Sequence, residues 1–303
     1  MVSVGYPAES ASSIGERVRR TVALLRRRGY AVSPPRLAEL CIGGRVSDPE
    51  IRWAVAADPD LAMAEGLVVE REAVSRASAI RSRSLAHRKD SVAYLDLTLA
   101  FVRKLVAVAP FIRAVSIAGS LASGGFRASD DVDLNLVVDD GHRHLAYVIV
   151  NVLGLLHAVG HRGKPVDDLT RRPIAPRLMT ANLILERSQC RPLARDDEDM
   201  AFEVLVSQPV FGLDVIKEIV EDNPRLLDHF PQLAGKTASR LVEAPGRRAP
   251  AVLFPAFFDL PARYIGHAAW RYMQWTRRNR PEALARVAYV RTTMRPYTLF
   301  DTN

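Results

Sequence analysis

The stretch SIAGSLASGGFRASDDVDLNLVVD, residues 116–139, decides the fold of this 303-residue chain. It opens with residues typical of a buried strand and is interrupted at Gly119 and Ser120. After a loop rich in glycine and serine, residues 131–138 alternate acidic or polar side chains with apolar ones. This alternation predicts a second strand that belongs to a sheet.

Asp131 and Asp133 give the second strand its chemistry. Residues two apart in a strand point to the same face, so these carboxylates lie together. Val132, Leu134 and Leu136 then pack on the opposite face. Adjacent carboxylates repel one another unless a cation lies between them. Mg2+ prefers oxygen ligands, and we expect it, or Mn2+, to bind here.

The Gly-Ser turn ahead of the acidic pair suits a phosphate. Gly119 lets the backbone approach a ligand, and Ser120 offers a hydroxyl and a backbone N–H. Gly-Ser, the spacer of residues 121–130 and then Asp-Val-Asp-Leu resemble the signature of the nucleotidyltransferase fold of the DNA polymerase β superfamily. The resemblance covers roughly residues 110–190. It is to a bacterial group with a small helical module before the signature and a helical tail after it.

The resemblance implies an α+β protein with a small mixed β-sheet flanked by helices. It implies a Mg2+-dependent enzyme that moves a nucleoside monophosphate from ATP or another nucleoside triphosphate to an acceptor hydroxyl, releasing pyrophosphate. The fold leaves open whether the acceptor is a small molecule, a protein or a nucleic acid. The expected site comprises catalytic, metal-binding Asp131 and Asp133, and nucleotide-binding Gly119, Ser120, Arg127 and Lys164.

A third carboxylate is not evident. Many proteins of the superfamily carry it on the neighbouring strand, which residues 178–186 are predicted to form. Here the matching face shows Thr180 and Asn182. Asn182 is a possible third position of the site: it can coordinate a metal through its carbonyl oxygen or hold a water, but it cannot take up a proton at neutral pH. The enzyme then uses two carboxylates only, or a nearby acid substitutes. The candidate substitutes are Glu186, Asp167 and Asp168.

The chain divides by pattern into four regions. Three amphipathic helices, the last over residues 48–57, precede apolar runs around Gly66 that suggest a β-wing. A helical stretch follows the predicted third core strand. The regions are a tail over 1–12, a winged-helix-like module over 13–75, the nucleotidyltransferase core with its preceding helices over 76–190, and a helical C-terminal region over 191–303.

The winged-helix-like module raises the alternative of a DNA-binding regulator. The helix over residues 48–57 carries acids and a single arginine, Arg52, which is poor chemistry for a phosphate backbone. We therefore expect a structural module. Residues 74–90 are predicted to form a basic, solvated helix and residues 91–108 a second helix. A further alternative, suggested by Asn182, is an inactive nucleotide-binding or regulatory protein of the same fold.

The composition of the chain indicates which ligands, location and membrane topology to expect. A formal charge of +8 and a pI of about 9.8 favour phosphorylated or polyanionic ligands. Cys41 and Cys190 have no partner at ligand spacing, so free thiols and a cytoplasmic location are expected. The longest uncharged run, residues 145–160, is too short to span a bilayer and favours a buried helix. This helix is expected over about residues 142–159, with Leu145, Ile149, Val152 and Leu156 against the sheet. The aromatic residues of a helix over 261–278 are expected to pack on the core.

Overall fold

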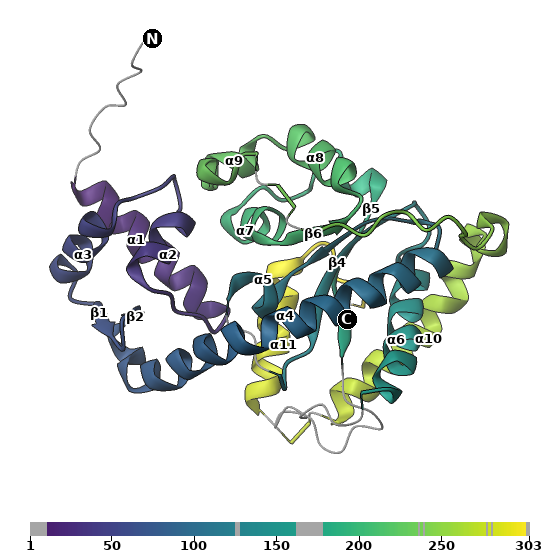
Figure 1. Cartoon of the computed structure of the whole chain (residues 1–303), viewed down its shortest axis with the longest axis horizontal. Helices are drawn as coiled ribbons and strands as arrows, with labels where there is room; N and C mark the ends of the chain where they lie inside the picture. Colours follow the sequence, from purple (N-terminus) through teal and green to yellow (C-terminus); the bar gives the residue numbers. More distant parts are fainter. Residues whose placement is uncertain are drawn as a thin grey trace, which may run out of the picture. The chain divides into compact units, whose positions relative to one another are not determined.

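The computed structural model of the chain describes residues 11–124, 128–161, 178–235, 237–238, 240–276, 278–279 and 281–300. This part of the chain is an α+β structure with two small sheets, as the sequence predicted at that level (Figure 1). Within it, no helix is both long enough and apolar enough to cross a membrane. Cys41 and Cys190 are buried and form no disulfide.

The described residues form eleven α-helices and six strands. The helices are α1 (Ala11–Arg27), α2 (Pro34–Leu40), α3 (Asp48–Ala57), α4 (Ala77–Val108), α5 (Gly119–Ser123), α6 (Arg143–Val159), α7 (Glu198–Val206), α8 (Leu213–Asp222), α9 (Arg225–His229), α10 (Asp259–Thr276) and α11 (Pro281–Met294). The strands are β1 (Leu61–Ala64), β2 (Leu67–Glu70), β3 (Ile112–Ile117), β4 (Val132–Val138), β5 (Met179–Glu186) and β6 (Gln208–Phe211).

The chain forms two compact units. The first comprises Met1–Leu85 with Leu227–Gly235, and the second comprises Ala86–Leu226 with Lys236–Asn303. The first unit thus extends past the predicted boundary at residue 75 and takes in a segment of the C-terminal region. The boundary falls within α4, where the sequence analysis expected two helices. No glycine or proline interrupts α4, so nothing in its sequence ends a helix.

The first unit has the predicted order of three helices and a hairpin. A capping box begins α3: the Ser47 N–H donates to Glu50 Oε2 over 2.8 Å, and the Glu50 N–H donates to Ser47 Oγ. Strands β1 and β2 pair antiparallel around Gly66. On the surface of α3, the Arg52 guanidinium lies 2.8 Å from Asp48.

The second unit is built on a four-stranded sheet in the order β5-β4-β3-β6. Strand β3 runs antiparallel to β4 and to β6, whereas β4 and β5 are parallel. The sequence analysis missed β6. It is a short edge strand that contains Pro209, and proline is tolerated in sheets mainly at edges.

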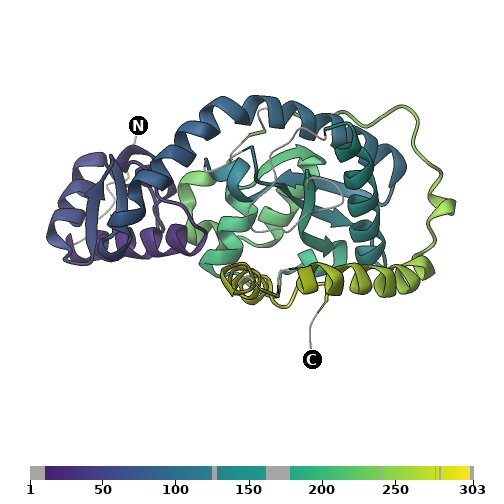
Figure 2. The same ribbon diagram turned by 90° about the horizontal axis from the view of Figure 1, so that it is seen from below.

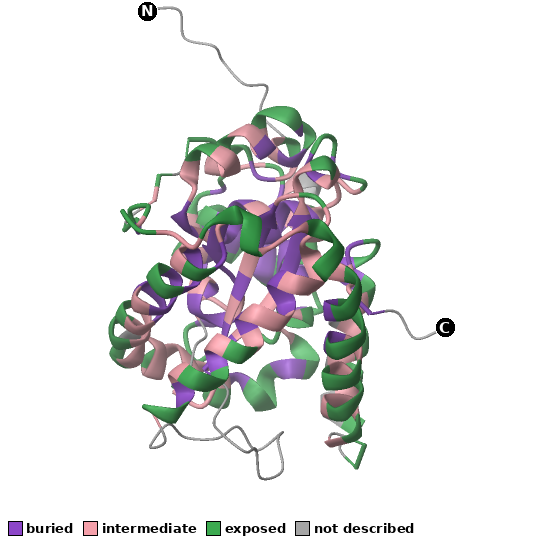
Figure 3. Cartoon of the chain, turned by 90° about the vertical axis from the view of Figure 1, so that its right-hand side faces the viewer, coloured by how far each residue is buried: buried purple, intermediate pink, exposed green. Residues whose placement is uncertain are grey.

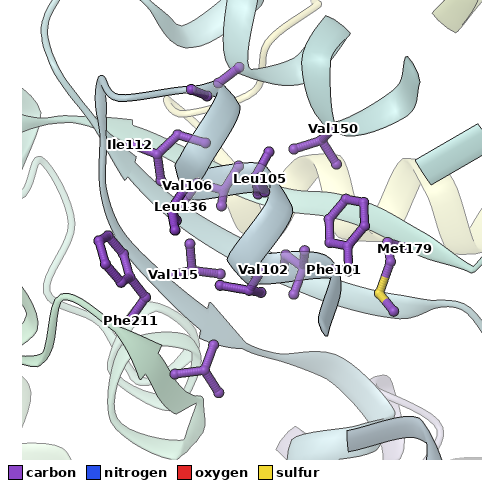
Figure 4. Packing of buried hydrophobic residues seen from close by; sticks show 14 of the residues in the cluster. Phe101, Val102, Leu105, Val106, Ile112, Val115, Leu136, Val150, Met179 and Phe211 are labelled. Atoms are coloured by element: carbon purple, nitrogen blue, oxygen red, sulfur yellow. The ribbon is translucent and has the colours of Figure 1, made fainter. Parts of the chain in front are cut away.

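Helices α4 and α6 cover one face of this sheet, and the buried residues concentrate on the strands (Figures 3 and 4). The apolar residues of β4 on this face are at most 1% exposed, as predicted. The labelled residues that α4 contributes are Phe101, Val102, Leu105 and Val106. One face of β4 is therefore covered by a continuous apolar layer.

The buried face of α6 was predicted only in part, since Leu145 and Ile149 do pack against the core. Val152 and Leu156 are 51% and 64% exposed, whereas Val150, Gly154 and Ala158 are buried. Because α6 is apolar nearly all round, its sequence does not mark one face. Small residues decide the packing: a Cβ on Gly154 would lie 3.3 Å from the Met179 carbonyl oxygen of β5.

Helix α10 packs beside α6 (Figure 2). The contact is close at Gly266, where a Cβ would lie 3.1 Å from Tyr147 Cδ1. The expectation that the aromatic residues of α10 pack on the core holds only for Trp270, which is half-buried against it. Tyr264 and Trp275 are 70% and 57% exposed.

Candidate active site

The Gly-Ser turn and the acidic strand meet in the structure. Helix α5 begins at Gly119, whose φ of +59° lies in the left-handed region that glycine adopts most readily. A Cβ on Gly119 would lie 2.9 Å from Asp133 Cγ and closer still to Oδ2. The Ala118 N–H also donates to the Asp133 carbonyl oxygen over 2.8 Å. The Asp133 carboxylate therefore lies directly on the glycine backbone, in a space that no other residue type leaves open.

The turn itself is a single turn of helix, where the sequence analysis expected a loop. Ser123 Oγ donates to the Gly119 carbonyl oxygen over 2.8 Å and ties the turn together. Ser120 is only 6% exposed, so a ligand reaches it through a small remaining surface. Before β4, Tyr94 of α4 donates to the Ala128 carbonyl oxygen over 2.9 Å. Burial, together with Asp90, raises the Tyr94 pKa, which keeps the phenol protonated as a donor.

Asp133 lies on the face of β4 opposite the apolar layer, as predicted, and Asp131 directly precedes the strand. Both residues are half-buried. Asp133 is in register with Thr180 of the parallel strand β5. Thr180 Oγ1 donates to Asp133 Oδ1 over 3.1 Å. This bond orients the carboxylate.

Asn182 lies next to this pair, beside a β-bulge in the pairing of β4 with β5. The pairing shifts between Leu134 and Asn135, so that Asn135 is opposite Leu183. Asn182 Nδ2 donates to Asn135 Oδ1 over 2.9 Å and to Glu203 Oε1 over 2.6 Å. Bulges are common beside active sites, where they redirect a side chain.

Asn135 and Glu203 were missed by the sequence analysis. Asn135 continues the two-residue alternation of Asp131 and Asp133, and this signal was available. Glu203 is the one charged residue in the run MAFEVLV of α7 and is 8% exposed. Its charge within an apolar helix was the signal, but only the fold brings α7 to this face of the sheet.

The donors at the site fit a hard divalent cation. Asp131 and Asp133 offer carboxylate oxygens, and Asn182 offers an amide oxygen. The described residues hold no group of three or more acidic, histidine or cysteine side chains that could bind a metal. Mg2+ is commonly bound through one or two carboxylates, together with water and substrate phosphates. The two aspartates match that manner of binding.

The structure does not bring every predicted site residue to this place. Arg127, Lys164, Asp167 and Asp168 lie outside the described residues. Glu186 is at the far end of β5, where its Oε1 accepts from the Gly141 N–H over 2.8 Å. At about 3.3 Å per residue, it lies about 20 Å along the strand from Thr180. Glu186 therefore does not replace the third carboxylate.

The chain was compared with models of protein families, with curated proteins and with solved structures, and none of the three comparisons gives a match. The chemistry of the site must therefore be inferred from the geometry of Gly119, Asp131, Asp133 and their neighbours.

Proposed function

We propose that the chain is a Mg2+-dependent nucleotidyltransferase with the fold of the DNA polymerase β superfamily in its second unit. It transfers a nucleoside monophosphate from ATP or another nucleoside triphosphate to a hydroxyl group of an acceptor. A bond forms between the acceptor oxygen and the α-phosphorus, the bond to pyrophosphate breaks, and the acceptor proton leaves to solvent.

One observation carries this proposal: the backbone of Gly119 packs directly against the Asp133 carboxylate. In a surface hairpin that carried acidic residues by chance, we would not expect the Gly-Ser turn to pack against Asp133. In a nucleotidyltransferase this contact has a purpose, because the triphosphate must reach the turn and the carboxylates at once. The hydrogen bond from Thr180 to Asp133 further fixes the carboxylate.

Asp131 and Asp133 would hold Mg2+, which when bound neutralises charge on the phosphate oxygens. Gly119 and Ser120 would bind the phosphates. Among the described residues beside the turn, Asn182 cannot accept the acceptor proton, so we expect this proton to pass to solvent. We expect Glu186→Gln to keep most activity, because this residue is held at the far end of β5.

Calorimetric titration with a non-hydrolysable ATP analogue tests the proposal. We expect binding that requires Mg2+ and that Asp133→Asn weakens by at least about tenfold. Asp139→Asn is the matched control, because Asp139 follows the same strand but pairs with Arg113 over 2.6 Å away from the turn. Equal affinity in Asp133→Asn and the wild type would remove Asp133 from the site.

A nucleotide-binding protein without transfer activity is the second candidate, favoured by Asn182 in place of a carboxylate. Its signature is Mg2+-dependent analogue binding without incorporation of nucleotide into any acceptor. The DNA-binding alternative gains no comparable support, because the Arg52 side chain of α3 is engaged by Asp48 on the same surface.

A further inference from the structure

Glu203 is a buried acid whose position needs a reason. It is 8% exposed on α7, and its neighbours on this helix, including Phe202 and Leu205, are buried apolar residues. Burying a carboxylate costs folding free energy unless hydrogen bonds compensate. The compensation comes from two amides of the candidate site, Asn182 over 2.6 Å and Asn135 over 3.2 Å.

The chemistry of these groups fixes how Asn182 is turned. Glu203 Oε1 accepts both hydrogen bonds, so both amides present their nitrogens to Glu203. Asn182 Nδ2 is shared between Glu203 and Asn135 Oδ1. The Asn182 amide oxygen therefore faces away from Glu203. Among the described residues, no group donates a hydrogen bond to that oxygen.

A second observation indicates that this part of the sheet is not arranged for stability alone. Ser116 of β3 is directly opposite Asn135 and is 1% exposed. Its hydroxyl has no hydrogen-bond partner within the described part of the chain. Buried Ser116 and half-buried Asn135 and Asn182 thus place polar side chains at one level on three neighbouring strands. Local costs of this kind are typical of functional sites.

We propose that Glu203 is a positioning residue: it holds Asn182 so that the amide oxygen serves as the neutral third oxygen of the metal site. This inference rests on the proposed nucleotidyltransferase function. The hydrogen bonds from Asn135 and Asn182 connect Glu203 to the polar face of the sheet. Glu203 acts through these amides.

Two substitutions at one position separate positioning from proton removal. The hydrogen bonds from Asn135 and Asn182 both end on Glu203 Oε1, and a glutamine at position 203 can place its carbonyl oxygen there. Glu203→Gln therefore keeps the orientation of the Asn182 amide. The methionine side chain of Glu203→Met is of similar length but accepts no comparable hydrogen bond, so this orientation is lost. If Glu203 instead took the acceptor proton, both substitutions would abolish transfer equally.

The first readout does not depend on activity. The side-chain amide signal of Asn182 in a 15N-correlated NMR spectrum is assigned by its loss in Asn182→Asp. We expect Glu203→Gln to retain the signal near its wild-type position and Glu203→Met to shift it and speed its exchange with solvent. An unchanged Asn182 signal in Glu203→Met overturns the positioning role.

The second readout is the Mg2+ concentration that gives half-maximal binding of the ATP analogue. We expect Glu203→Met to raise it by at least about tenfold and Glu203→Gln by less than about threefold. If the wild type shows no Mg2+-dependent binding, the proposed function fails and this role with it. If the wild type binds but Glu203→Met has the wild-type Mg2+ requirement, only the positioning role fails.

A third variant covers the case in which Glu203→Met does not fold. Asn182→Asp places a carboxylate where an amide now lies 2.6 Å from Glu203. Two carboxylates this close cannot both ionise readily. Mg2+ affinity should then vary with pH between about 6 and 8 in Asn182→Asp but not in Asn182→Asp/Glu203→Gln. Identical pH profiles for the two variants would contradict the proposed contact.

Discussion

The two faces of β4 show how one strand serves two purposes. On one face Val132, Leu134 and Leu136 are at most 1% exposed and lie under α4 and α6. On the other, Asp133 and Asn135 are half-buried and hydrogen-bonded to β5 and α7. The strict alternation of a strand places stability and chemistry only one residue apart.

The difference has an energetic consequence. Full burial of an aliphatic side chain contributes about 1.5–3 kcal/mol, whereas a typical hydrogen bond contributes about 1 kcal/mol net. Substitutions on the apolar face should therefore lower stability. Substitutions on the polar face should lower function while the protein stays folded. The predictions below test this separation, beginning with the largest expected effect.

Asp131→Asn and Asp133→Asn should each lower nucleotidyl transfer by at least about 1000-fold, which corresponds to about 4 kcal/mol in the barrier. The reason is loss of the charge that holds the metal. Melting temperatures should stay close to the wild-type value. Near-full turnover with Mg2+ in either variant would show that the pair does not bind the catalytic metal.

Gly119→Ala should reduce affinity for the ATP analogue by about 100-fold, because the new Cβ displaces the Asp133 carboxylate. The matched control is Gly124→Ala. Gly124 also has a positive φ, +99°, but a Cβ there meets nothing within 4 Å among the described residues. Both variants carry backbone strain of order 1 kcal/mol. Equal loss of affinity in both would attribute the effect to strain and not to the contact with Asp133.

Leu134→Ala should lower the free energy of unfolding by about 2–5 kcal/mol, the usual cost of a cavity in a packed core. Urea denaturation measures it. Affinity for the analogue, measured where the variant is still folded, should change by less than about threefold. A large loss of affinity in folded Leu134→Ala would mean that the two faces of β4 are not separable.

Asp259 forms a polar cluster at the start of α6, outside the candidate site. It accepts from the His144 ring over 2.7 Å and from the His144 and Leu145 N–H groups at the start of α6. Burial acts to raise the Asp259 pKa, but these hydrogen bonds outweigh it, and the net pKa is lowered. The stabilisation is therefore present above the unfolded-state pKa of about 3.9 and is lost as pH falls through the folded-state value.

Asp259→Asn should consequently cost about 1–2 kcal/mol at neutral pH. The difference from the wild type should narrow as the pH approaches about 3. Urea denaturation at several pH values measures this, with Asp139→Asn as the exposed control, expected to cost at most about 1 kcal/mol. A difference that is independent of pH would mean that the Asp259 charge does not stabilise α6.

Much of the site could be predicted because its signals are local. The alternation around Asp131 and Asp133 and the Gly-Ser turn lie within one continuous stretch, and the structure brings Gly119 of the turn against Asp133. The capping box of α3 is equally local. Short-range rules of this kind require no knowledge of what the chain packs against.

The features that were missed depend on contacts between distant segments. Glu203 matters only because α7 lies over β4 and β5, and the buried face of α6 is set by Gly154 against Met179. Edge strand β6 pairs with β3 despite Pro209. In each case the local pattern was ambiguous, and packing across the sheet decided the outcome.

The central claim is tested most directly by radiolabel transfer. Purified protein is incubated with Mg2+, heat-inactivated cell extract and ATP or another nucleoside triphosphate carrying the label on either its α- or its γ-phosphate, so that no kinase or pyrophosphatase of the extract acts on the label. We predict that α-label appears in an acceptor, that γ-label appears only in pyrophosphate, and that Asp131→Asn/Asp133→Asn transfers neither. Incorporation of γ-label into an acceptor, or α-label transfer by the double variant at the wild-type level, would contradict the account.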